Sequence, residues 1–388
     1  MSEPRIVASS TAARALLVLL ASSAATLAVG LFVAPDRVAD SLLIAAFGVL
    51  TLFLGGLVFL AFHYISGARW SHAATRVYAI LTKNLWLGGL AMLAVIALRR
   101  DAYAWLPPEG EEAGTFWFKA AWLSSTALVV RAAIYVGLWS LLAAAMVRNV
   151  RAENADAQRR NRVLAPIVLL VFAPTFSLAA CDWFMALEPM WFSTVWGAYH
   201  FAGLATSTLA VVVLLALHLR RVGFWRGAFT DDHLHDLGKL LLGFSCFWMY
   251  LWFCQYMLIW YSNIPEETAY FVHRTQGAWG PLLLANVAFN WVVPFLVLLP
   301  RPAKRSATVM ARVAAIVLVG RWLDLYLMVY PSREGAAPRW GVWEAAGILL
   351  AVAGGMYLIQ SALANAPSDA RLAPAATESA SPGSPAAV

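Results

Sequence analysis

The chain has 388 residues, of which 61% are hydrophobic and only 13% are charged. A water-soluble domain could not cover that much apolar surface, so the composition excludes an ordinary soluble enzyme and predicts a membrane protein. The formal net charge of +7 does not indicate a nucleic-acid partner, because the basic residues fall in short turns between apolar runs and form no continuous stripe.

Ten apolar runs follow one another along the chain, and each can cross a hydrocarbon core of roughly 30 Å as a helix of about 20 residues. The first run is longer than the core of a secretory signal, so we expect a retained helix. We expect an all-α integral membrane protein in which spans 2–5 and 6–9 form two four-helix bundles, with the first and last spans at the periphery. The predicted spans are residues 13–34, 39–65, 74–98, 119–147, 163–186, 193–219, 238–262, 278–300, 308–330 and 341–363.

Basic residues gather in alternate turns of this chain path. Arg and Lys are frequent at residues 69–83, 148–162, 220–226 and 301–305, whereas the turn at 109–112 is rich in glutamate. Because cytoplasmic loops are enriched in Lys and Arg, we expect a multi-pass protein of a bacterial inner membrane with both termini in the cytoplasm.

Two domains are expected along the chain. Residues 1–363 would form the membrane domain, and residues 364–388, which are rich in Ala, Pro and Ser, would form a disordered cytoplasmic tail.

A faint internal repeat links the two predicted bundles. The second span ends near His63 before an Arg-Trp pair at 69–70, and the sixth ends near His218 before a Trp-Arg pair at 225–226. Two explanations stay open: duplication of a four-helix unit, or the tendency of Arg and Trp to gather at membrane interfaces.

Ligands for metals and haem are sparse. Cys181, Cys246 and Cys254 form no C-x-x-C or C-x-x-C-H motif, so iron–sulfur ligation, covalent haem and a disulfide framework have no support. His63 and His218 could ligate a b-type haem together, but no second histidine pair lies deeper in the bilayer. We therefore expect that this chain alone binds no metal ion and no cofactor.

Charged residues inside a span cost about 2.5–3.5 kcal/mol each on insertion scales, so each needs a partner or a function. Arg131, in the fourth span, is expected either to pair with a neighbouring helix or to line a pathway. Arg321 and Asp324, in the ninth span, share a helix face and form either a local neutral pair or a proton-carrying carboxylate beside its arginine. Asn286 and Asn290 share a face of the eighth span and are expected to form interhelical hydrogen bonds.

Asp182 ends the fifth span and His200 begins the sixth, so both lie in the outer third of the membrane on this topology. A carboxylate and an imidazole at similar depth suit a quinol hydroxyl or a proton relay, although each could also simply reach water.

Three glutamates are candidate outer-face contacts. Glu188 belongs to residues 181–194, an apolar and acidic stretch that is too short to span and is expected in the outer interface. Glu266 and Glu267 follow Pro265, and this order also fits the first turn of a helix, where carboxylates face the positive end of the helix dipole.

Four stretches, in this order along the chain, carry a family resemblance. They are residues 62–70 (FHYISGARW), 182–203, 255–267 (QYMLIWYSNIPEE) and 320–326 (GRWLDLY). Together they resemble the NrfD-like (polysulfide reductase membrane subunit) superfamily, and within it the ActF-type subunits of alternative complex III.

The resemblance implies a respiratory complex that oxidises quinol or menaquinol and passes electrons to a terminal oxidase or a soluble carrier. The redox centres would lie in partner chains, namely an iron–sulfur subunit and haem c subunits, next to a sister NrfD-like subunit. This chain would be a structural subunit, with proton conduction or quinone binding as further roles. The candidate residues for such a pathway are Asp182, His200, Arg131, Arg321, Asp324 and His63.

Two other classes remain open. A secondary transporter of a small solute or ion would also have about ten spans, internal repeats and charges near the midplane. A membrane b-type cytochrome is the third interpretation, and an absorption spectrum separates it from the other two.

Overall fold

The computed structural model describes residues 10–67, 72–103, 117–152, 154–188, 191–224, 229–331 and 337–364, and these ranges contain helices and connecting turns but no strand. The expected all-α fold class is therefore confirmed. The elements are α1 (Ser10–Val33), α2 (Pro35–Ser66), α3 (His72–Thr82), α4 (Leu85–Leu98), η1 (Arg100–Tyr103), α5 (Trp117–Trp122), α6 (Ser125–Ala152), α7 (Ala155–Trp183), η2 (Met185–Leu187), α8 (Trp196–Arg221), α9 (Asp231–Ser262), α10 (Pro265–Thr275), α11 (Trp279–Val287), η3 (Ala288–Val292), α12 (Val293–Leu298), α13 (Arg301–Arg305), α14 (Ala307–Val329) and α16 (Val342–Ala364).

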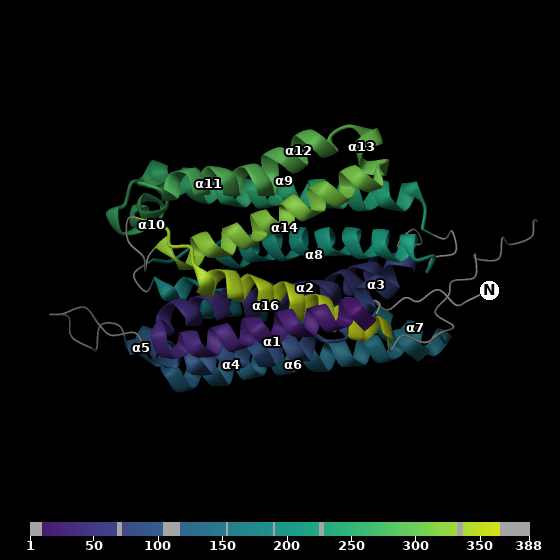
Figure 1. Ribbon diagram of the computed structural model, residues 1–388, viewed down its shortest axis with the longest axis horizontal. Helices are drawn as coiled ribbons and strands as arrows, with labels where there is room; N and C mark the ends of the chain where they lie inside the picture. The colour runs from purple at the N-terminus through teal and green to yellow at the C-terminus, as the bar shows by residue number, and fades with distance from the viewer. Residues whose placement is uncertain are drawn as a thin grey trace, which may run out of the picture.

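The long helices lie side by side along one direction (Figure 1). Within the described residues, nine helices are long and apolar enough to cross a membrane. The remaining predicted span coincides with α14, whose 23 residues give a length of about 34 Å. α14 differs from these nine because it carries three charged residues, Arg312, Arg321 and Asp324, within one span length. The protein is thus of the multi-pass membrane type, and the count of ten spans stays a prediction.

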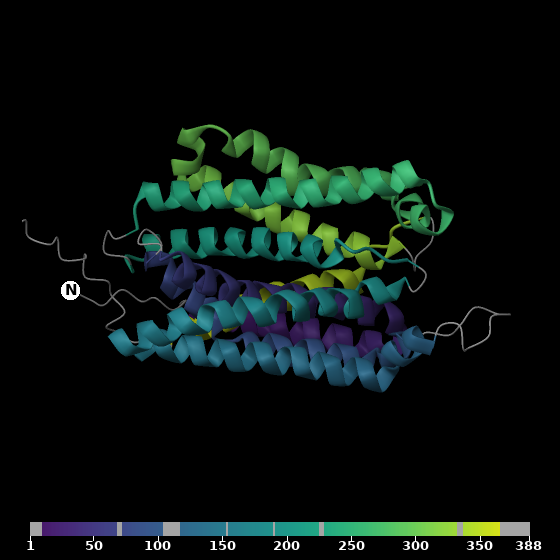
Figure 2. The ribbon, with the colours of Figure 1, turned by 180° about the vertical axis from the view of Figure 1, so that it is seen from behind.

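Two groups of helices pack around two central helices. α2 contacts α3, α4, α7 and α16, and we call α2, α3, α4, α6 and α7 the first unit. α8 contacts α9 and α14, and we call α8 to α14 the second unit. The units meet where α2 and α7 contact α8, while α1 packs mainly on α16 (Figures 1 and 2). Whether the units arose by duplication stays a hypothesis.

The start of α1 and the end of α16 lie at the same end of the bundle (Figure 1). At the opposite end, which we call the outer end after the predicted topology, α7 and α14 finish and α8 begins. The side chains discussed below come mostly from this outer end.

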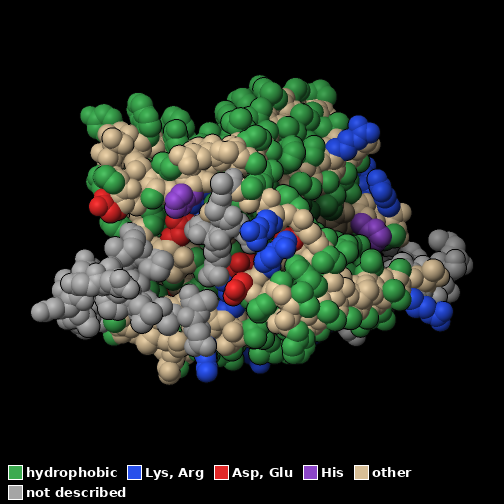
Figure 3. Space-filling model, turned by 60° about the vertical axis from the view of Figure 1, so that its left-hand side comes forward, with side chains coloured by type: hydrophobic (Ala, Val, Ile, Leu, Met, Phe, Trp, Pro, Cys, Tyr) green, Lys and Arg blue, Asp and Glu red, His purple; other side chains and the backbone are tan. Residues whose placement is uncertain are grey.

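The surface of the bundle is apolar over a wide area. Leu141, Leu170 and Leu284 are 71%, 75% and 72% exposed on three different helices, and Figure 3 shows apolar side chains over much of one face. Such a surface is unfavourable in water and suits the acyl chains of lipid.

Helix boundaries differ from the expected spans where polar residues cap or break a helix. The fourth span is divided, because Leu123 and Ser124 lie between α5 and α6. α7 begins well before residue 163, since the Asn154 side chain accepts a hydrogen bond from the Ala157 amide at 2.8 Å and caps the helix outside the apolar run. Apolar runs reveal the part of a helix that lies in lipid, not its full length.

The helix directions give a test of topology. In a variant whose three native cysteines are replaced by serine, Ala155→Cys should react only with reagents that enter the cytoplasm, and Gly110→Cys with impermeant reagents added outside. Labelling of whole cells measures both. Reaction of position 155 from outside, or of position 110 only from inside, would contradict the predicted orientation.

Candidate functional site

Asp324, near the outer end of α14, accepts hydrogen bonds from four side chains and is only 2% exposed. Its Oδ1 accepts from the Tyr199 hydroxyl at 2.5 Å and from the Asn286 amide at 3.2 Å. Its Oδ2 accepts from Arg321 Nη1 at 2.6 Å and from the Trp248 indole at 3.4 Å. Helices α8, α9 and α11 thus direct donors at one carboxylate of α14. The Tyr199 bond has the length of a charge-assisted hydrogen bond.

Arg321 forms the expected local pair with Asp324 and is itself 4% exposed. Its guanidinium lies against Gly203 of α8, where a Cβ atom would stand 2.3 Å from Nη1, so any larger residue at that position would force the guanidinium to move. Among the described residues, Arg321 Nε and Nη2 have no hydrogen-bond partner. Buried donors of this kind are usually satisfied by ordered water.

Two asparagines, Asn286 of α11 and Asn290 of η3, extend the network. Asn290 donates to Asn286 Oδ1 at 2.7 Å and to the Asn286 carbonyl at 3.0 Å. Because Asn286 in turn donates to Asp324, the expected interhelical hydrogen bond is formed. Asn290 lies in the π-helical segment η3, an irregularity that often marks functional sites in helices.

Arg274 of α10 is buried at the outer end of the second unit. Its Nη2 lies 2.6 Å from Glu188 Oε1, and its other donors bind the carbonyls of Tyr270 and Leu327 at 2.7 and 2.8 Å. The guanidinium also lies 3.4 Å from the centre of the Tyr270 ring. Burial raises the pKa of the Tyr270 hydroxyl far above its ordinary value, so this group stays neutral at physiological pH.

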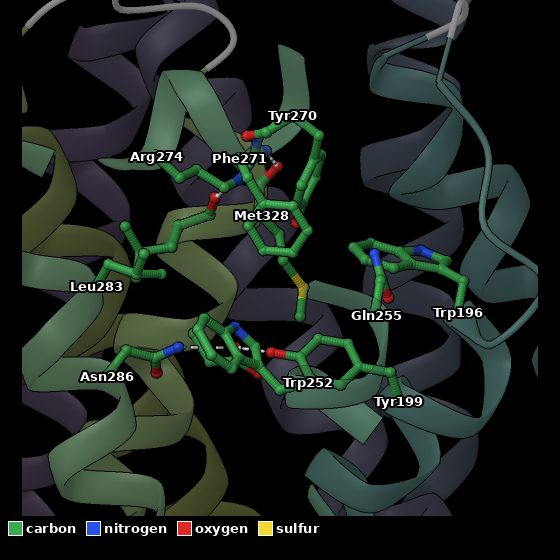
Figure 4. A pocket seen from close by; sticks show the side chains of 12 residues that line it. Trp196, Tyr199, Trp252, Gln255, Tyr270, Phe271, Arg274, Leu283, Asn286 and Met328 are labelled. Carbon is green, nitrogen blue, oxygen red and sulfur yellow. Dashed lines mark hydrogen bonds between the residues drawn. The ribbon is translucent and has the colours of Figure 1, made fainter. Parts of the chain in front are cut away.

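A small cavity separates the Asp324 network from Arg274 (Figure 4). Its volume is about 20 Å³, which is enough for one water molecule and far below the several hundred Å³ of a pocket for an organic ligand. The conformation described here therefore has no room at this place for a quinone headgroup. The polar residues that line the cavity are Tyr199, Gln255, Tyr270, Arg274, Asn286 and Asp324.

Asp182 is held in a separate network at the end of α7 and is 1% exposed. Arg131 binds it through two nitrogens, with Nη2–Oδ1 and Nε–Oδ2 distances of 2.8 and 2.9 Å. The Trp122 indole and the Tyr135 hydroxyl add hydrogen bonds of 2.8 and 3.1 Å. Arg131 therefore takes the expected role of pairing with a neighbouring helix, and its partner is Asp182.

His200 is fully buried, and neither ring nitrogen has a hydrogen-bond partner among the described residues. Its ring is surrounded by the rings of Phe47, Phe184, Trp196 and Tyr199, with centroid distances of 4.9–6.3 Å. His200 lies where the two units meet, because Phe47 and Phe184 come from the first unit. It makes no direct hydrogen bond to either aspartate.

The remaining predicted residues are dispersed. Glu266 and Glu267 occupy the first turn of α10 after Pro265, as expected for a helix start. His63 is buried near the inner end of α2, and His218 is exposed at the end of α8. The acidic turn at 109–112 lies outside the described residues, and so does the predicted tail from residue 365 onward.

Four residues of the site were missed by the sequence analysis. Tyr199, Trp248 and Gln255 are uncharged residues of apolar runs, and nothing in those runs shows which residues face inward. Arg274 follows the predicted helix start at Pro265. Nothing in the sequence indicated that a charged residue there would be buried, yet Arg274 is only 2% exposed. The signal available in the sequence was the presence of this charged residue about two helical turns after the helix start predicted at Pro265.

No family model matches this chain. A search of curated proteins finds no match either. The family resemblance therefore rests on the four sequence stretches, and the function is inferred from the site.

The Arg131–Asp182 network gives a prediction for stability. Asp182→Leu should destabilise the chain by about 3–5 kcal/mol because it leaves Arg131 buried without its partner, whereas Arg131→Leu combined with Asp182→Leu should cost much less. Thermal unfolding of the detergent-solubilised protein measures both. Equal losses in the single and double variants would show that the pair does not act as a unit.

Proposed function

We propose that this chain is an integral membrane subunit of a quinol-oxidising respiratory complex of the alternative complex III type, and that its second unit conducts protons. Two features support the proposal, and they share the residues Tyr199, Arg321 and Asp324. One is the resemblance of the four stretches to NrfD-like subunits. The other is the Asp324 network, which is built on an ionisable residue inside the apolar bundle, where such residues are rare and usually functional.

The observation that carries proton conduction is the continuity of polar groups around Asp324. From the middle of the bundle outward, the groups are Asn290, Asn286, Asp324, Tyr199 and the water-sized cavity next to Arg274. The amides of Asn290 and Asn286 position the carboxylate by hydrogen bonds, whereas Asp324, Tyr199 and a water in the cavity can give and accept protons. A proton relay needs such a chain of groups at hydrogen-bonding distance.

In the proposed reaction a quinol gives up two electrons and two protons and becomes a quinone. The electrons pass to iron–sulfur and haem c centres of partner subunits, next to a sister NrfD-like subunit. Asp324 would accept a proton as a carboxylate and release it towards the outer end, with Arg321 balancing its charge after release. Asp182 and His200 stay candidate members of a pathway at the interface of the units.

Replacement of Asp324 tests this proposal. Asp324→Asn keeps the size and a hydrogen-bonding group but cannot carry a proton as a carboxylic acid does. In the assembled complex we expect proton release coupled to quinol oxidation to fall at least about tenfold, which corresponds to about 1.4 kcal/mol in the barrier. Stopped-flow measurement of proton release from vesicles provides the value.

Two controls accompany this variant. Asp40→Asn changes a buried aspartate that pairs with Arg99 and is not a candidate for the pathway, so it shows whether any such change in the bundle impairs coupling. Arg321→Leu with Asp324→Leu removes both charges, and it should be nearly harmless if the pair is only structural. Wild-type coupling in assembled Asp324→Asn would refute proton conduction through this residue.

A secondary transporter is the second candidate. The π-helical interruption between α11 and α12 favours it, since transporters use broken helices near the midplane.

Purification under mild conditions separates the candidates. We expect haem-containing partner chains to co-purify, and we expect the isolated chain to show no haem absorption band. Purification as a homo-oligomer without partners would favour a transporter. A stoichiometric b-haem band that is lost in His63→Ala would indicate a cytochrome.

A further inference from the structure

Gln255 of α9 is a buried polar side chain without a partner. It is 6% exposed, lines the cavity beside Asp324 (Figure 4), and forms no hydrogen bond with its side chain within the part of the chain that the structure describes. A primary amide has two donors and one acceptor. The Gln255 amide is not among the fully buried atoms without a partner, so it is accessible from the cavity, where a small polar ligand can bind it.

The other polar groups at the cavity define how that ligand can bind. The Asp324 carboxylate already accepts four hydrogen bonds, which is about its full capacity. The Tyr199 hydroxyl donates to Asp324 but keeps free lone pairs. Asn286 Nδ2 and Arg274 each donate only part of their N–H groups to known acceptors. The cavity thus offers acceptors on Tyr199 and Gln255 and donors on Gln255, Asn286 and Arg274.

We propose that the cavity holds one ordered water molecule that bridges the Gln255 amide and the Tyr199 hydroxyl. The volume of about 20 Å³ holds a single water, and a buried water needs two to four polar partners, which these side chains supply. Gln255 is then a positioning residue, because it orients the water towards Tyr199 and does not itself accept a proton.

The role of this water rests on the proposed proton conduction, whereas its presence does not. When Asp324 is protonated, its own O–H donates to the Tyr199 oxygen and the Tyr199 O–H turns from Asp324 towards the water. Asp324 then gives its proton to Tyr199 while Tyr199 gives its hydroxyl proton to the water. The net result is one proton moved outward, with Asp324 left as a carboxylate and Tyr199 neutral again. Arg274 lines the cavity and pairs with Glu188, and in this proposal the Glu188 carboxylate takes the extra proton from the water.

The test is a cryo-EM map of the intact complex that resolves ordered water, combined with proton-release kinetics. In the wild type we expect density within hydrogen-bonding distance of both Gln255 and Tyr199. In Gln255→Leu, which keeps a similar volume, the density should be lost and proton release should slow about fivefold, the effect of one lost hydrogen bond of about 1 kcal/mol. Gln360→Leu, the same change in α16, is the matched control and should alter neither.

The outcomes separate this inference from the proposed function. An empty cavity in the wild-type map overturns the water site, even where Gln255→Leu fails to assemble. Density that persists unchanged in Gln255→Leu overturns the role of Gln255. If the water is present and Gln255-dependent but Asp324→Asn keeps full coupling, the water site stands and proton conduction fails.

Discussion

Every charged side chain placed inside this bundle has to be matched, because lipid cannot solvate it and removal of one partner leaves an uncompensated charge at a cost of several kcal/mol. The described helices meet this constraint with arginine–carboxylate pairs at or near the outer end. These pairs are Arg37–Glu344, Arg99–Asp40, Arg131–Asp182, Arg274–Glu188 and Arg321–Asp324. Most of them join different elements, so the pairing fixes which helices are neighbours. Apolar packing alone is much less selective, since one leucine-rich face fits many others.

Two of the buried aspartates have similar partners but are bound differently by their arginines. Asp182 and Asp324 each accept from an arginine, a tyrosine hydroxyl and a tryptophan indole. Arg131 binds Asp182 with two nitrogens, and that geometry locks α6 to α7. Arg321 binds Asp324 with one nitrogen and keeps two others unpaired. The carboxylate of Asp324 is therefore held less completely by its arginine, and it lies beside space for water.

Much of the fold could be predicted from the sequence, because apolar runs of spanning length leave few alternatives to helices in lipid. The Arg321–Asp324 pair was also predictable, since a spacing of three residues places both on one face of a helix. The partnership of Arg131 with Asp182 was not, because it depends on how α6 and α7 are rotated towards each other. The same holds for Gln255 and Tyr199, which are indistinguishable from lipid-facing or core residues until the packing is known. The start of α7 at Ala155 depended on the Asn154 cap, which acts outside the apolar run.

Gly203 has a consequence for how the second unit can move. The Arg321 guanidinium occupies the volume that a Cβ atom would fill on α8. The side chain of α14 therefore sits in a notch on the surface of α8 at Gly203. A slide of α14 by one helical turn, about 5.4 Å, would carry the guanidinium out of this notch and against neighbouring side chains. α8 and α14 should thus behave as one stiff body on the timescale of turnover. Any movement within the second unit is then left to the pass formed by α11, η3 and α12, whose π-helical turn interrupts the regular helix.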